Sequence, residues 1–134
     1  MYCVREISPD IYWVGGNDRR IALFENMFPL TNGVAYNSYI IMDEKTALVD
    51  TVDDAITELY LENVKHVLNG RELDYLIINH MEPDHCGNIE NIIKLYPNVK
   101  VIGNAKSFQL FNQFYNMDIT KNQMLVAEGD ELNL

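Results

Sequence analysis

Four side chains that can bind a metal ion stand within six consecutive residues of this chain. They are His80, Glu82, Asp84 and His85, in the sequence H-M-E-P-D-H. Imidazole nitrogen and carboxylate oxygen together suit iron, manganese or zinc, and no cysteine is spaced among these residues to select a thiolate-binding metal. Because burying such groups without partners would be costly, the spacing favours metal coordination over a merely polar loop.

The segment before this motif predicts how the side chains are presented. Residues 75–79 form the apolar run Y-L-I-I-N, the pattern of a strand buried on both faces. Sites in α/β folds lie at the carboxyl ends of such strands. Residues i, i+2 and i+4 of an extended backbone share a face, so we expect His80, Glu82 and Asp84 to converge. Met81 is then expected to point away.

Pro83 and His85 extend this prediction to a second metal. Pro83 disfavours a helical conformation at the residue before it and fits poorly inside a helix, which supports an extended motif. His85 follows Asp84 directly, so we expect it to reach a second metal where the chain turns into the next helix. The motif therefore predicts part of a two-metal site.

The rest of the chain alternates predicted strands with amphipathic helices. Strands 34–42 and 46–50 are expected to form a β-hairpin around the polar turn 43–45. A helix is expected between the cap region 51–54 and the pair Asn69-Gly70, and Asn104 is a candidate N-cap for another. Further strands are expected at 11–14, 75–79, 99–102 and 124–127, and further helices at 89–96 and 105–115. This order predicts one layered α/β domain.

Composition narrows the classes of function. The chain has 134 residues, of which 48% are apolar, enough for one hydrophobic core. Acidic residues outnumber basic ones by 20 to 10, so the summed field repels nucleic acids and anionic membranes. No secretory signal or membrane span is recognised, and we expect a cytoplasmic protein. Cys3 and Cys86 are far apart and are expected to be free thiols.

The motif H-x-E-x-D-H, followed by Cys86-Gly87-Asn88, resembles the first metal motif of the metallo-β-lactamase superfamily in its flavodiiron branch. Glu82 decides the branch, because hydrolytic members such as glyoxalase II have histidine at that position. The hairpin segment V-A-Y-N-S-Y-I-I and the strand end L-V-D-T are also similar. The resemblance covers almost the whole chain and implies that residues 1–134 are the N-terminal portion of a metallo-β-lactamase-like αββα sandwich. It places the flavodoxin-like domain outside this chain.

The resemblance also implies a role for each residue of the motif. His80 and Glu82 would bind one iron, and Asp84 the other. His85 would lie at the second iron, either bound to it or just outside its ligands. Asp50, at the end of its strand, would lie near the irons without binding them, or would cap a turn.

Several parts of the family pattern are missing from these residues. They are a further histidine, a bridging aspartate, a last histidine and the domain that binds FMN. His66, the only other histidine, sits in an amphipathic helix and is expected to be structural or exposed. No phosphate-binding loop occurs, so FMN is expected in the full-length protein and not on this segment. Cys86 replaces the small Ser or Ala of the family, as a buried small group or as a thiol open to oxidation.

The function implied by the resemblance is that of a flavodiiron oxidoreductase, which reduces dioxygen or nitric oxide at two non-haem irons. Electrons would come from FMN, supplied by rubredoxin or a similar donor, and homo-oligomers are expected. The chain alone is expected to be inactive. Two alternatives stay open: a metallo-hydrolase acting on a thioester, lactone or phosphodiester, against which Glu82 counts, and a non-catalytic fragment that another chain completes.

Overall fold

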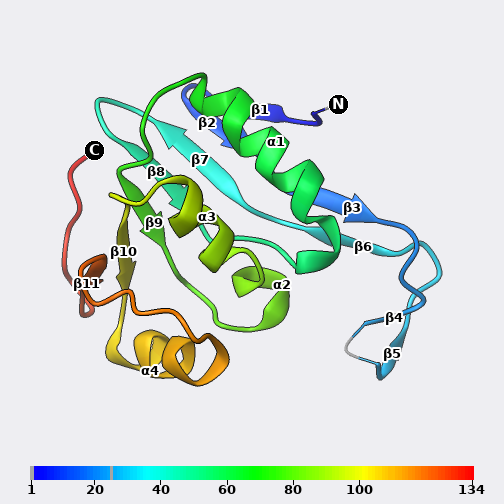
Figure 1. The fold of residues 1–134 in the computed structure, drawn as a ribbon. Helices are drawn as coiled ribbons and strands as arrows, with labels where there is room; N and C mark the ends of the chain where they lie inside the picture. The colour runs from blue at the N-terminus through cyan, green and yellow to red at the C-terminus, as the bar shows by residue number, and fades with distance from the viewer. Residues whose placement is uncertain (1, 25) are drawn as a thin grey trace.

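A seven-stranded sheet forms the centre of the computed structural model, which describes residues 2–24 and 26–134 (Figure 1). The strand order is β1-β2-β7-β8-β9-β10-β11. The first four of these strands are antiparallel neighbours, whereas β8 to β11 run parallel. The bounds are β1 Arg5–Ser8, β2 Ile11–Trp13, β7 Tyr39–Met42, β8 Thr46–Val49, β9 Tyr75–Ile77, β10 Lys100–Gly103 and β11 Gln123–Leu125.

Helices make the crossovers that parallel strands require. A 3₁₀ turn, η1 (Asp54–Ile56), and α1 (Thr57–Leu68) join β8 to β9. Two short helices, α2 (Pro83–Cys86) and α3 (Ile89–Leu95), join β9 to β10, and α4 (Ala105–Phe114) joins β10 to β11. The α/β organisation expected from the sequence is confirmed. None of the helices in the described part of the chain is long and apolar enough to cross a membrane.

The ends of the helices follow the local sequence signals. Asn69 ends α1 with a positive φ of 47°, a conformation that asparagine tolerates better than most residues. Asn104 precedes α4, and its side chain accepts a hydrogen bond from the Ser107 N–H at 2.9 Å. Both predicted helix boundaries are confirmed.

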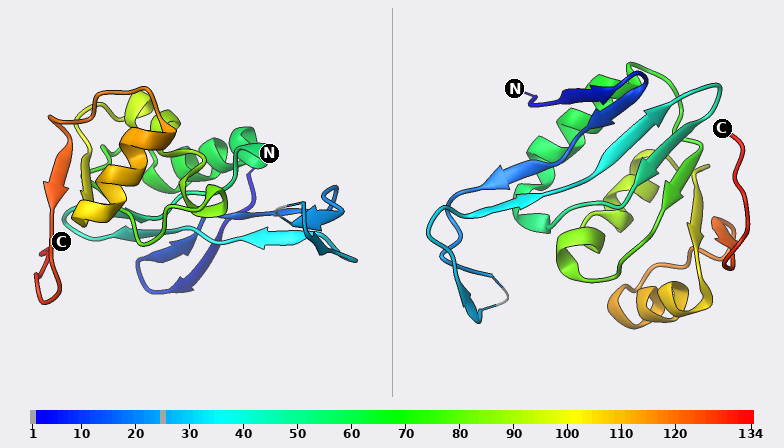
Figure 2. Two further views of the ribbon diagram at one scale, coloured as in Figure 1. Left: turned by 90° about the horizontal axis from the view of Figure 1, so that it is seen from below. Right: turned by 180° about the vertical axis from the view of Figure 1, so that it is seen from behind.

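All four helices pack on one face of the sheet (Figure 2). The strand residues that face them form the core row Ile40, Leu48, Leu76 and Val101, and each of these side chains is fully buried. Successive residues of a strand point to opposite faces, so every second strand residue lies on the other side. The core therefore lies between the sheet and its helices.

The opposite face, which we call the bare face, has no second layer over it among the described residues (Figure 2). The strand register aligns an apolar row across it: Trp13, Tyr39, Val49, Ile77 and Ile102. All but Ile102 remain partly exposed. The prediction that residues 75–79 are buried on both faces is therefore wrong, because helices cover one face only, and β9 ends at Ile77.

The predicted strand 34–42 is two strands in two sheets. β6 (Val34–Tyr36) pairs with β3 (Gly16–Asp18), whereas β7 begins at Tyr39. The break falls at Ser38, whose hydroxyl donates to the Asp50 carbonyl at 3.0 Å and lies 3.1 Å from the Tyr60 hydroxyl. These long-range contacts are not visible in a local pattern. The predicted hairpin itself is confirmed as β7 and β8, with Tyr39 opposite Val49.

Beyond β3 and β6 the chain forms an arm that projects from the body (Figure 1). The arm holds a short ladder of β4 (Leu23–Phe24) and β5 (Phe28–Pro29). Met27 is 67% exposed and Phe28 is 57% exposed. The arm was not expected from the sequence, since two-residue strands carry almost no periodic signal.

Candidate metal centre

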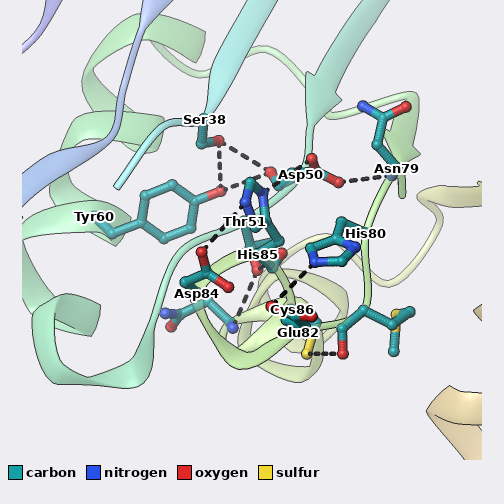
Figure 3. A network of polar contacts seen from close by, with 12 residues as sticks. Ser38, Asp50, Thr51, Tyr60, Asn79, His80, Glu82, Asp84, His85 and Cys86 are labelled. Carbon is teal, nitrogen blue, oxygen red and sulfur yellow. Dashed lines mark hydrogen bonds and ion pairs between the residues drawn. The ribbon is translucent and has the colours of Figure 1, made fainter. Parts of the chain in front are cut away.

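The four residues of the motif gather at the carboxyl ends of β8 and β9 (Figure 3). His80 and Glu82 lie in the loop between β9 and α2, and Asp84 and His85 lie within α2. Asp50 enters from the end of β8. The parallel arrangement of β8 and β9 brings the two loops together, as expected for a site in this class of fold.

The local backbone differs from the extended one predicted for the motif. Glu82 is extended, with ψ of 155°, but α2 begins at Pro83. Proline suits the first helical position, because the N–H that it lacks would have no partner there. The prediction that Asp84 shares an extended face with His80 and Glu82 is therefore wrong. Met81 is buried in the core, whereas His80 and Glu82 are exposed.

Each histidine of the motif lies beside a carboxylate. The Nε2 atom of His80 is 3.3 Å from Oε2 of Glu82, and Nε2 of His85 is 3.4 Å from Oδ2 of Asp84. The two imidazole rings meet edge to face, with their centroids 5.2 Å apart. The nitrogen and oxygen atoms that would bind metal thus face one another in two adjacent pairs.

Asp50 holds His85 from the side opposite Asp84. Its Oδ2 lies 3.2 Å from His85 Nδ1, and its Oδ1 accepts the Asn79 N–H at 2.7 Å. The backbone of Asp50 has a positive φ of 53°, an uncommon conformation that turns the chain at the end of β8. A proton on Nδ1 donated to Asp50 leaves Nε2 free to bind a metal. The near-site position expected for Asp50 agrees with this contact.

Hydrogen bonds from Thr51 and Asn88 clamp α2 against the segment that follows Asp50. The N–H and hydroxyl of Thr51 both donate to the His85 carbonyl, at 2.8 and 2.9 Å. The Asn88 amide donates to the carbonyls of Val52 and Asp53, at 3.0 and 3.1 Å. These contacts fix the direction in which α2 presents Asp84 and His85.

Tyr115 adds a further clamp from the end of α4, where its hydroxyl donates to the Cys86 carbonyl. No clamping role was predicted for Thr51, Asn88 or Tyr115. Thr51 directly follows Asp50, and Asn88 lies three residues after His85, so their positions in the sequence could have indicated a role at the site. Tyr115 lies 29 residues from Cys86 in the sequence, and no local sequence pattern predicts this contact.

Cys86 fits the interpretation of a buried small group. Its side chain is 3% exposed, and its thiol donates to the Met81 carbonyl at 3.4 Å. Burial raises the pKa of the Cys86 thiol, which keeps it protonated and makes it a poor metal ligand. Cys3 and Cys86 are both free, as predicted. His66 is exposed on α1, where its ring stacks on Tyr2 with centroids 3.5 Å apart.

The donor atoms fit a metal, although the set is incomplete. Asp84 Oδ1 is buried, and no group in the described residues forms a hydrogen bond with it. The side chains of His80 and Glu82 are 49% and 56% exposed, so nothing in the described structure encloses them. Within residues 2–24 and 26–134, no three His, Cys, Asp or Glu side chains are grouped closely enough to hold a metal.

Further acidic groups surround the site. Asp53 and Asp54 lie at the start of η1, and the Asp53 carboxylate accepts the Ala55 N–H at 2.9 Å. Burial raises the pKa of Asp53, and the negative charges of Asp54 and Asp84 raise it further. These carboxylates make the surroundings of the motif strongly negative.

Comparison with known proteins decides the family. The family model described as "ODP family beta lactamase" matches residues 34–134. The chain belongs to this family. The metallo-β-lactamase-like fold class is therefore confirmed, and this chain supplies one helix-covered sheet of it.

Relatives of the family extend the likeness to flavodiiron proteins. The nitric oxide reductase of Moorella thermoacetica is 36% identical over 129 residues, which are 96% of this chain and 32% of that protein. The flavodiiron protein of Giardia intestinalis superposes with a TM-score of 0.89 at 24% identity, over 98% of this chain and 32% of that one. The rubredoxin oxygen:oxidoreductase of Desulfovibrio gigas gives 0.86 at 26% identity, over 96% and 32%.

These comparisons confirm the flavodiiron resemblance that Glu82 indicated. The chain spans about a third of the length of each of these three proteins. The metal-binding roles of His80, Glu82, Asp84 and His85 stay predictions, because neither the comparisons nor the structure tests them.

Proposed function

We propose that the full-length protein to which this chain belongs is a flavodiiron oxidoreductase that reduces dioxygen or nitric oxide. The observation that carries the proposal is the meeting of His80, Glu82, Asp84 and His85 in two imidazole–carboxylate pairs. The presence of Glu82 where hydrolytic members have histidine supports iron and redox chemistry. The names of the relatives, among them a nitric oxide reductase and a rubredoxin oxygen:oxidoreductase, agree with it.

The residues of this chain would hold part of a two-iron site. His80 and Glu82 would bind one iron, Asp84 the other, and His85 would lie at the second. Two bound irons supply the electron transfer to the diatomic substrate, with FMN and a rubredoxin-like donor as the source of electrons. Asp50 orients the imidazole of His85, and the clamp formed by Thr51 and Asn88 fixes α2.

The incomplete ligand set indicates where the remaining ligands come from. Four motif side chains cannot fill the coordination of two metals and a bridge between them. We therefore assign the missing ligands, and the FMN site, to parts of the full-length protein outside these residues. The same argument makes this chain inactive by itself.

Metal identity gives the decisive test. The full-length protein, purified anaerobically, should contain about two irons and one FMN per chain and should consume dioxygen or nitric oxide when supplied with reduced rubredoxin. Elemental analysis, flavin absorbance and a gas electrode measure these quantities. Stoichiometric zinc together with thioesterase or lactonase activity would establish the hydrolase alternative instead.

A further inference from the structure

A small cavity lies beside the candidate metal centre, between it and the projecting arm. Its volume is about 120 Å³. The residues that line it are Ile21, Phe24, Tyr36, Asp53, Pro83 and Asp84. Tyr36, Asp53 and Asp84 contribute oxygen atoms, and the other three residues contribute apolar surface. The cavity therefore offers hydrogen-bonding partners to a small ligand within an otherwise apolar lining.

Two buried polar atoms of the residues that line the cavity have no hydrogen-bonding partner among the described residues. Tyr36, the last residue of β6, is 2% exposed, and its hydroxyl forms no hydrogen bond with any described residue. Asp84 Oδ1 is in the same position. Buried hydroxyl and carboxylate oxygens are hydrogen-bonded in almost all folded proteins, because leaving them unpaired costs about 1–3 kcal/mol each. Asp84 Oδ2 is the oxygen beside His85 Nε2, at 3.4 Å, which leaves Oδ1 for a ligand in the cavity that also bonds to Tyr36.

Size and chemistry identify that ligand as water. A volume of this size holds a few water molecules at roughly 30 Å³ each, whereas pockets for organic cofactors are about 300–1,000 Å³. The cavity itself offers a metal ion only the carboxylates of Asp53 and Asp84 and no histidine, which favours water as its occupant. Water can both donate to the carboxylates of Asp53 and Asp84 and accept from the hydroxyl of Tyr36.

We propose that the cavity holds a hydrogen-bonded water cluster that joins Asp53 and Tyr36 to Asp84 and delivers protons to the metal centre. The delivery role rests on the proposed function. Reduction of dioxygen gives water, and reduction of nitric oxide gives nitrous oxide and water. Both reactions take up one proton for every electron delivered. The electrons come from FMN, and the protons must cross the protein by a separate route.

The geometry gives each group a part in that route. Asp53 is half-buried beside the exposed Asp54, so its carboxyl exchanges protons with solvent. Each water, and the hydroxyl of Tyr36, accepts one proton while releasing another, and is unchanged afterwards. Burial, with the charges of Asp53 and Asp18, raises the pKa of Tyr36 to about 12, so the phenol keeps its proton at neutral pH and can pass one on.

A crystal structure of the full-length protein tests the water cluster independently of any activity. We expect ordered water within hydrogen-bonding distance of both the Tyr36 hydroxyl and Asp84 Oδ1. In the Tyr36→Phe variant the water next to residue 36 should be lost while the fold is kept. A dry cavity, or a Tyr36 hydroxyl bonded to another protein group, would overturn the proposal.

Kinetics test the delivery of protons. Tyr36→Phe should retain wild-type iron and FMN, lower the rate of gas reduction roughly tenfold or more, and enlarge the solvent deuterium isotope effect as proton transfer becomes limiting. Asp53→Asn keeps an oxygen to accept the Ala55 N–H and should act in the same direction. Tyr75→Phe is the matched control, because the Tyr75 hydroxyl accepts from Lys45 at an exposed position away from the cavity.

The possible results separate this inference from the proposed function. A wild-type rate and isotope effect in Tyr36→Phe, with gas reduction intact, would refute the proton route alone. If the wild-type protein loaded with iron reduces neither gas, the proposed function fails and the delivery role fails with it. The crystallographic result then still decides whether the water cluster exists.

Discussion

At the scale of single residues, Glu82 separates the proposed oxidoreductase from a hydrolase. Its side chain is 56% exposed, and its Oε2 atom lies 3.3 Å from His80 Nε2. An exposed pair of this kind contributes little to stability, so its removal should leave the fold intact. We predict that Glu82→Ala in the full-length protein lowers the retained iron to roughly half and abolishes most gas reduction, since one of two sites loses a ligand.

Glu58 provides the matched control for that prediction. It is exposed in the first turn of α1, away from the metal motif, and Glu58→Ala should change neither iron content nor activity. Iron analysis after desalting and a gas-consumption assay on both variants give the answer. Equal iron occupancy in the two variants would remove Glu82 from the ligands.

We propose that Asp50 acts on the metal site through His85, because its Oδ2 lies 3.2 Å from His85 Nδ1. Asp50→Asn keeps an oxygen for the Asn79 N–H but replaces the carboxylate beside His85 Nδ1 with an amide. Loss of such an orienting carboxylate typically weakens metal binding about 10–100-fold. We predict a fall of that size in ferrous iron affinity, measured by competition with a chelator, while Asp43→Asn in the surface turn leaves affinity unchanged. An unaltered affinity in Asp50→Asn would show that the contact is merely structural.

Residue types in the motif were sufficient to predict which side chains gather, but not how the backbone presents them. The effect of Pro83 on the residue before it predicts an extended motif, whereas in the structure Pro83 begins α2. Proline disfavours a helix before it and favours one after it, and the sequence alone did not show which effect applied. The hydrogen bond from Tyr115 to Cys86 depends on how α4 packs, which no local sequence pattern predicts.

At the scale of elements, the position of α2 depends on a close approach at Gly87. A Cβ atom there would lie 2.8 Å from the Asp54 nitrogen and 2.8 Å from the Val52 carbonyl oxygen, both backbone atoms. Neither atom can yield without moving the segment that holds Asn88. We predict that Gly87→Ala destabilises the folded chain by about 1–3 kcal/mol, the usual cost of overpacking, and also weakens metal binding.

Gly103 in β10 is the comparison for this substitution. A Cβ atom at Gly103 would lie 3.3 Å from the Ser107 Cβ and 3.5 Å from the Phe108 ring, both longer than the backbone contacts at Gly87. Denaturant unfolding of the full-length variants should show the larger loss for Gly87→Ala. Equal losses for the two variants would mean that the approach of α2 to the preceding segment is not tight in solution.

Elements with a strong period were predicted well, and elements defined by long-range contacts were not. Helix α1 follows its apolar spacing from the cap region to Asn69, because its face packs on the sheet along its whole length. The strand expected at 34–42 divides at Ser38, since that side chain is held by Asp50 and Tyr60 in the core. The alternating sequence pattern of a strand continues across Ser38, so it does not reveal the break between β6 and β7.

At the scale of the whole molecule, the sheet has one covered face and one bare face. The row from Trp13 to Ile102 across the bare face is apolar and mostly half-exposed. Soluble proteins rarely leave a contiguous apolar surface of this kind uncovered. The expected αββα sandwich explains it, because the second sheet of that fold would pack there.

The last prediction concerns residues 1–134 expressed alone. Reconstituted anaerobically with ferrous iron and then desalted, this chain should retain well under two irons and reduce neither dioxygen nor nitric oxide, because four motif ligands are too few and His80 and Glu82 are half-exposed. The bare face, with the open outer edge of β11, should also make it self-associate. Metal counting, a gas-consumption assay and light scattering measure these properties. A monomer that retains two irons and turns over would show that this chain completes the site through residues not recognised as ligands.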